Sequence, residues 1–134
     1  MANALYDKGR EGILDGTIGM TGDIRVCLVK STYAQNLATD DFMADIGTDD
    51  NGRSAALGSK TYTAGVFDAA DTTLVATAAV ACEALVIFQH TGVDATARLI
   101  AYIDTPSAGL PFTPSAGQTV NIAWDSGANK IFKL

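Results

Sequence analysis

Histidine and cysteine are scarce in this chain, and that scarcity limits the chemistry that the sequence predicts. The 134 residues include one histidine, His90, and two cysteines, Cys27 and Cys82. The cysteines are far apart, with no C-x-x-C spacing and no histidine close in sequence, so the ligand pattern of a zinc site is absent. No G-x-S-x-G segment supplies a nucleophile for His90. We therefore expect buried, reduced thiols, no metal, no cofactor and no enzymatic activity.

Charge of both signs is also limited. Charged residues make up 18% of the chain and hydrophobic residues 48%, and nine basic against fifteen acidic residues give a net charge of −6. A negative field repels phosphate groups, so we expect no direct nucleic-acid partner. A globular domain usually carries about 25% charged residues. The lower fraction here predicts that neighbouring subunits cover part of the surface.

Long apolar runs are missing as well. Near the N-terminus, charged residues interrupt any stretch that could act as a signal peptide. No apolar segment approaches the roughly 20 residues that a membrane-spanning helix needs. The sequence therefore predicts a protein made in the cytoplasm, with no membrane partner.

Short apolar segments with strand-like alternation dominate what is present. In DIRVCLVK, Ile24, Val26 and Leu28 share one face. In VACEALVIFQH both alternating sets are apolar, which is typical of a central strand. Further strands are predicted in KTYTAGVF, TTLVAT, ARLIAYID, TVNIAWD and NKIFKL, with the last two forming a hairpin around Ser126 and Gly127.

Two side chains within these strands leave alternatives open. Arg98 interrupts an apolar strand, so it either pairs with a buried carboxylate such as Glu83 or faces a neighbouring subunit. Trp124 alternates with apolar residues, which predicts a core aromatic, with an anchor between subunits as the alternative.

Helical signals are confined to two places. Residues 2–15 form the best helix candidate, with Asn3 as its cap, although Gly9 and Gly12 each cost about 1 kcal/mol relative to alanine. Such a helix needs tertiary support. A short helix is predicted in DDFMADI, capped by Thr39, and the following TDDNGRSAALGS is predicted to be an exposed, mobile loop.

These signals together predict one domain over residues 1–134, with an N-terminal segment or arm over 1–22 and a β domain over 23–134. The fold class is mainly β: a β-sandwich or jelly-roll-like domain with an N-terminal helical segment and one short helix.

Several segments of the chain, in their order and their residue types, resemble a group of small virion structural proteins of tailed bacteriophages. The segments that carry this resemblance are MANALYDKGREGILDG, DDFMADI, RLIAYIDT followed by LPFTP, and WDSGANKIFKL. The resemblance implies a capsid decoration or cement protein on the virion capsid surface, bound to the major capsid protein and assembled as a homotrimer. It implies no catalytic residues.

Two other functions remain open from the sequence. The first is a tail tube, adaptor or baseplate component, which is also structural. The second is a carbohydrate-binding module, a class that often binds sugars with exposed aromatics, although Tyr33, Tyr62 and Tyr102 are too scattered in the sequence to argue for it.

The N-terminal segment is the predicted contact region for a partner protein, because it combines apolar and basic residues. The predicted contacts are Leu5, Tyr6, Lys8, Arg10, Ile13 and Leu14, with Phe42 and Met43 as a second patch. We expect deletion of residues 1–15 to abolish capsid binding and to leave the β domain folded.

Overall fold

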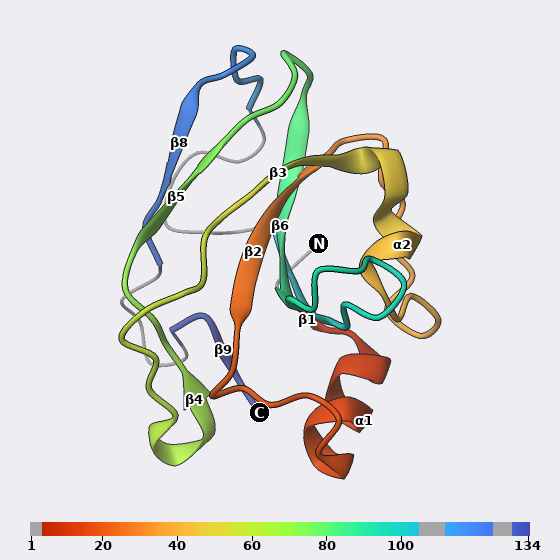
Figure 1. The fold of residues 1–134 in the computed structure, drawn as a ribbon, viewed down its shortest axis with the longest axis vertical. Coiled ribbons are helices and arrows are strands. Elements are labelled where there is room, and N and C mark those ends of the chain that lie inside the picture. The colour runs from red at the N-terminus through yellow and green to blue at the C-terminus, as the bar shows by residue number, and fades with distance from the viewer. Residues whose placement is uncertain (1–3, 105–111, 125–129) are drawn as a thin grey trace.

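The structure is a computed structural model that describes residues 4–104, 112–124 and 130–134 (Figure 1). Several antiparallel sheets and two short α-helices make up these ranges, which confirms the predicted mainly-β class. The predicted Asn3 cap and the turn at Ser126 and Gly127 lie outside the described residues. In the ranges described, no helix has the length and apolar character needed to cross a bilayer.

The largest sheet has five antiparallel strands, and its middle strand is the one that the sequence predicted. Their order across the sheet is β1 (Ala4–Leu5), β7 (Leu99–Ile103), β6 (Cys82–Gln89), β2 (Ile24–Lys30) and β3 (Asp50–Arg53). Strand β6 pairs with β2 on one side and with β7 on the other. Neighbours cover both its edges and both its faces, so the run from Ala84 to Phe88 within β6 is apolar and buried.

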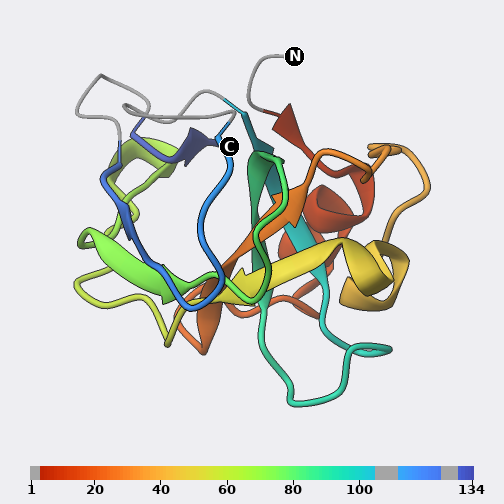
Figure 2. The same ribbon diagram turned by 90° about the horizontal axis from the view of Figure 1, so that it is seen from above.

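One face of this sheet, the strand-covered face, packs against two pairs of short strands. The pairs are β5 (Thr72–Val75) with β8 (Thr119–Ile122), and β4 (Val66–Phe67) with β9 (Phe132–Lys133). Leu85 and Ile87 of β6 belong to the same buried cluster as Leu74 of β5 and Val120 of β8. Figure 2 shows β5 and β8 on one side of the sheet and α2 on the other, a sandwich-like arrangement.

The opposite face, the loop-covered face, lies under helix α2 (Met43–Ile46) and the segment 31–41. The hydroxyls of Tyr6 and Tyr33 lie 2.8 Å apart, and the Tyr33 hydroxyl donates to Asp40 Oδ2 at 2.6 Å. Burial raises the pKa of both tyrosines, so their hydroxyls stay protonated as donors. This chain of hydrogen bonds fastens the segment to the sheet.

Residues 48–59 were predicted to be an exposed loop, and for much of this segment the prediction is wrong. It contains β3, and Asn51 and Ser54 are buried within it. Asn51 Oδ1 accepts from Thr77 Oγ1 and from the Ala78 amide, both at 2.9 Å, and Nδ2 donates to the Ala78 carbonyl at 3.2 Å. Buried polar groups are tolerated when they are hydrogen-bonded. Local composition does not reveal such partners.

The N-terminal segment is an integral part of the domain rather than a separate arm. Strand β1 pairs with β7, and helix α1 (Asp7–Asp15) packs against β7. A Cβ at Gly9 would lie 2.8 Å from the carbonyl oxygens of Leu99 and Ile100. The glycine therefore permits the close approach of helix and strand that gives α1 its tertiary support.

Three local predictions for the helices and C-terminal strands have mixed outcomes. The short helix exists but is not capped by Thr39; the Asp45 carboxylate instead accepts from the amides of Asp41 and Phe42 at 2.8 and 3.0 Å. Trp124 is a core aromatic as predicted, with its indole N–H donating to Ala70 O at 3.1 Å. The last two strands do not pair with each other, because β8 joins β5 and β9 joins β4.

Candidate interaction surface

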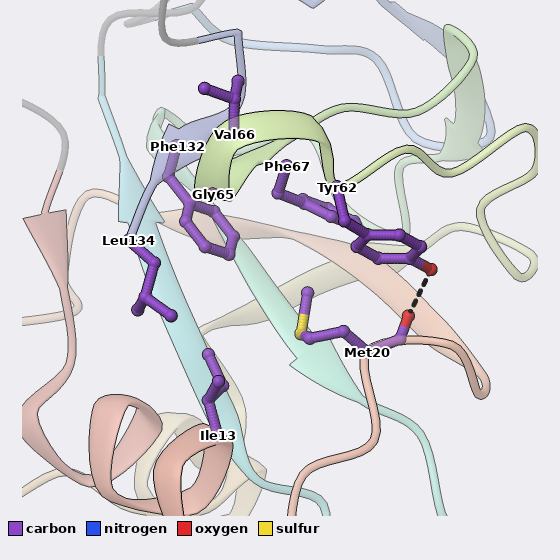
Figure 3. Close-up of a pocket in the computed structure, with 8 residues that line it drawn as sticks. All are labelled: Ile13, Met20, Tyr62, Gly65, Val66, Phe67, Phe132 and Leu134. Atoms are coloured by element: carbon purple, nitrogen blue, oxygen red, sulfur yellow. Dashed lines mark hydrogen bonds between the residues drawn. The ribbon is translucent and has the colours of Figure 1, made fainter.

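An apolar groove opens at the end of the domain where α1, the 3-10 turn η2 (Thr63–Gly65) and β9 meet (Figure 3). Its volume is about 150 Å³. All its lining residues are uncharged: Ile13, Met20, Tyr62, Gly65, Val66, Phe67, Phe132 and Leu134. These residues come from both ends and the middle of the chain, so the groove exists only in the folded protein.

Aromatic packing and strand pairing hold the groove in shape. The ring of Phe67 is buried, with its centroid 5.2 Å from that of Phe132 and 6.0 Å from that of Tyr62. The Tyr62 hydroxyl donates to the Met20 carbonyl at 3.0 Å, a bond drawn in Figure 3. Pairing of Val66 with Lys133 joins β4 and β9, the two strands that carry Phe67 and Phe132. The walls of the groove are therefore positioned before any partner binds.

Exposed apolar side chains gather around the groove. Among the described residues, the exposed large hydrophobic side chains are Leu14, Tyr62, Val75, Val93 and Leu134. Tyr62 and Leu134 line the groove, and Leu14, which is 81% exposed, directly follows the lining residue Ile13 on α1. Exposed apolar patches with polar surroundings mark sites of protein–protein contact.

Charged residues lie close in sequence to the lining residues of α1 and β9. Helix α1 ends with Asp15 and has no basic residue in its last turn, so the negative end of the helix dipole adds to a carboxylate there. Hydrogen bonds from Thr17 lower the pKa of Asp15 and keep it ionised. Lys133 is exposed on β9, but it lies between the lining residues Phe132 and Leu134, so its side chain faces away from the groove. We call the eight lining residues together with Leu14 the groove surface.

Three of the predicted contact residues are buried, so the prediction that they are exposed to a partner is wrong. Leu5 of β1 belongs to the core, and Tyr6 is fully buried with its hydroxyl against Tyr33. Met43 packs on the loop-covered face. Their apolar character serves the core of this domain, and deletion of residues 1–15 would remove part of that core.

The other predicted contacts are at least partly accessible, and the structure separates them into three groups. Ile13 and Leu14 lie at the groove. The basic residues of α1 are paired on the helix surface: Lys8 with Glu11 and Arg10 with Asp7, each at 3.0 Å. The predicted second patch is reduced to Phe42, whose ring is partly buried and lies 5.4 Å from the Arg98 guanidinium carbon.

Arg98 takes the first of its two predicted roles, with a different acid. Its Nε lies 2.8 Å from Asp41 Oδ1, so the paired carboxylate is Asp41 rather than Glu83. Arg98 Nη2 also donates to the Lys8 carbonyl at 2.9 Å. The guanidinium thus connects the residue just before β7 to the first turn of α1 and to the segment that leads into α2.

Sequence reasoning missed most of the groove. It assigned Tyr62 and Phe132 to strands without predicting that they share a surface with Ile13. One usable signal was present, because Phe132 and Leu134 alternate and therefore share a face at the end of the chain. Nothing in the local pattern indicates that α1 lies beside that face.

The three tyrosines considered for a carbohydrate site do not form an exposed aromatic surface. Tyr33 and Tyr102 are buried, with ring centroids 6.3 Å apart, and only Tyr62 of the three is exposed. Cys27 and Cys82 are free and buried, and burial raises the pKa of both thiols. Across the described ranges, no three side chains of His, Cys, Asp or Glu come together in a way that could hold a metal ion.

Comparisons with family models, with curated proteins and with solved structures find no match to this chain.

Proposed function

We propose that this protein is a non-enzymatic structural component of a tailed-phage virion, a capsid decoration or cement protein that binds the major capsid protein on the outside of the shell. The observation that carries the proposal is the groove surface: a preformed, uncharged groove with the exposed Leu14 beside it. The resemblance of the sequence to small virion proteins supports the same role.

The small size of the groove is compatible with binding to a repeated capsid lattice. A groove of about 150 Å³ cannot by itself supply a tight interface. On a shell, however, contacts that are individually weak gain effective affinity when several are engaged together. The net charge of −6 suits a position outside the shell, away from packaged DNA.

The location of the protein in the particle tests the proposal. We expect a density map of the phage particle to show copies distributed over the shell in a fixed ratio to the major capsid protein. Copies found only in a ring on the tail would contradict the decoration role and support a tail component instead. Particles that contain no copies would remove both.

A binding assay on shells that lack the protein tests the role of the groove surface. Purified protein is added to such shells and co-sedimented with them. Leu14→Asp is expected to weaken binding by at least about tenfold, because it places a charge in an apolar contact. Val93→Asp is the matched control: it adds the same charge at an exposed apolar residue outside the groove surface, and should bind as the wild type does.

A further inference from the structure

Asn51 and Gly52 form the one Asn-Gly pair in the sequence, and both lie in β3. In an open chain, the backbone nitrogen of such a glycine attacks the side-chain amide carbon of the asparagine, and glycine hinders the attack least because it has no side chain. The nitrogen gives up its proton, the side-chain nitrogen leaves as ammonia, and a succinimide ring forms. Water then opens the ring to aspartate or isoaspartate.

Tertiary contacts require both residues of this labile pair. Gly52 has φ of +127°, and a Cβ there would lie 2.3 Å from the Val75 carbonyl oxygen, so only glycine fits. Asn51 is fully buried, and its Nδ2 donates to the Ala78 carbonyl and to Cys82 Sγ, both at 3.2 Å. An ionised aspartate has no donor for these two acceptors. The fold therefore retains a dipeptide that is chemically unstable in an open chain.

The folded structure restrains both reacting groups. The Gly52 N–H donates to Asp50 Oδ1 at 2.8 Å, so loss of its proton would leave a negative nitrogen beside a carboxylate. Movement of the Asn51 amide towards that nitrogen would break its hydrogen bonds with Thr77 and Ala78. The reaction therefore requires that β3 first opens locally or that the whole domain unfolds.

We propose that the Asn51-Gly52 pair is a latent deamidation site, closed in the folded protein and reactive in the unfolded chain. Aspartate at position 51 would bury a charge that cannot donate to Ala78 or Cys82, and isoaspartate would add one carbon to the main chain of β3. Each reaction therefore removes a molecule from those that can fold, whereas molecules that stay folded keep the amide. The inference does not depend on the groove surface or on the proposed function.

Mass spectrometry of the peptide that contains position 51 tests the site. The protein is incubated in mildly alkaline buffer, either folded or unfolded in urea, and the conversion of Asn51 is followed with time. Deamidation should be at least about 100-fold slower in the folded protein, because a stable domain is open for only a small fraction of the time. Rates that differ by less than this factor, or no conversion in urea, would overturn the inference.

Asp15→Asn is the matched control, because it creates a second Asn-Gly pair at an exposed position. A Cβ at the neighbouring Gly16 would meet no atom within 4 Å. Position 15 of this variant should therefore be converted at similar rates in the folded and the unfolded protein. If the fold protected position 15 as strongly as Asn51, the protection would not come from the contacts of Asn51, and the inference would be wrong.

Asn51→Asp tests the consequence for folding. It should lower the equilibrium constant for folding by at least about tenfold, because the carboxylate is buried against acceptors. Asn121→Asp makes the same change at an exposed residue of β8 and should be as stable as the wild type. Chemical denaturation measures both variants, and failure of Asn51→Asp alone to fold is the extreme form of the expected result. Equal stability of the two variants would contradict the proposed loss of folding.

Discussion

The two faces of the five-stranded sheet are built from the same strands but covered in different ways. On the strand-covered face, strands from distant parts of the chain pack apolar side chains onto β2 and β6. On the loop-covered face, a short helix and the segment 31–41 are fastened by the hydroxyls of Tyr6 and Tyr33 and the carboxylate of Asp40. Apolar packing is non-directional and depends on close fit, whereas the second cover depends on particular donors and acceptors. Substitutions should therefore disturb the two faces by different mechanisms.

The largest effect is expected on the strand-covered side, at Gly52. This glycine has φ of +127°, and a Cβ there would lie 2.3 Å from the Val75 carbonyl oxygen of β5. Gly52→Ala should lower the free energy of unfolding by at least about 4 kcal/mol, because backbone strain and a backbone clash act together. Chemical denaturation measures this change.

Gly58→Ala is the matched control, since a Cβ at Gly58 meets no atom within 4 Å. It should change the free energy of unfolding by no more than about 0.5 kcal/mol. Equal effects at the two glycines would contradict the close contact between β3 and β5.

An intermediate effect is expected on the loop-covered face. Tyr33→Phe removes the hydroxyl that contacts both Tyr6 and Asp40, and should cost about 2–3 kcal/mol because one acceptor is charged. Tyr6→Phe leaves the bond between Tyr33 and Asp40 in place and should cost about 1 kcal/mol. Denaturation gives both values, and faster hydrogen exchange confined to the segment 31–41 would locate the change. A larger loss of stability in Tyr6→Phe than in Tyr33→Phe would mean that the hydrogen bond from Tyr33 to Asp40 is not the main one holding the segment 31–41 on the sheet.

The smallest effect is a dependence of stability on pH. Two hydrogen bonds from Arg53, at 2.9 and 3.0 Å, lower the pKa of Asp94 below its ordinary value of 3.8. The resulting stabilisation is complete above that ordinary value and is lost as pH falls through the lowered pKa. It should amount to less than about 1 kcal/mol, since the Asp94 side chain is about half exposed.

Asp94→Asn tests this assignment. The variant should be less stable than the wild type at pH 7, and the difference should shrink as the pH is lowered below about 4. Thermal unfolding at several pH values measures it. A difference that stays constant over this range would mean that the ion pair with Arg53 contributes nothing.

The parts of the fold that could be predicted are those where burial follows from local pattern. Strand β6 is the clearest case: Val86 and Phe88 face one cluster while Leu85 and Ile87 face the other, as their alternation predicted. The prediction of an exposed loop around Asn51 was wrong because the burial of this segment does not follow from its local pattern. Its residue types are those of exposed loops, and only the distant partners Thr77 and Ala78 make its burial tolerable.

The candidate site was predictable only in part. Apolar character marked Ile13, which lines the groove, and the exposed Leu14, but the same criterion selected Leu5, Tyr6 and Met43, which are buried. Hydrophobicity alone does not distinguish a core residue from an interface residue, because both are apolar.

The amino-acid order by itself determined the mainly-β class, the central position of β6 and the strand at β2, because an alternating pattern specifies which faces of a strand are buried. Tertiary structure alone decided that α1 lies directly on β7, that β8 and β9 pair with earlier strands, and that a groove forms between α1 and β9. These features depend on contacts between residues far apart in the chain, and no local periodicity encodes such contacts.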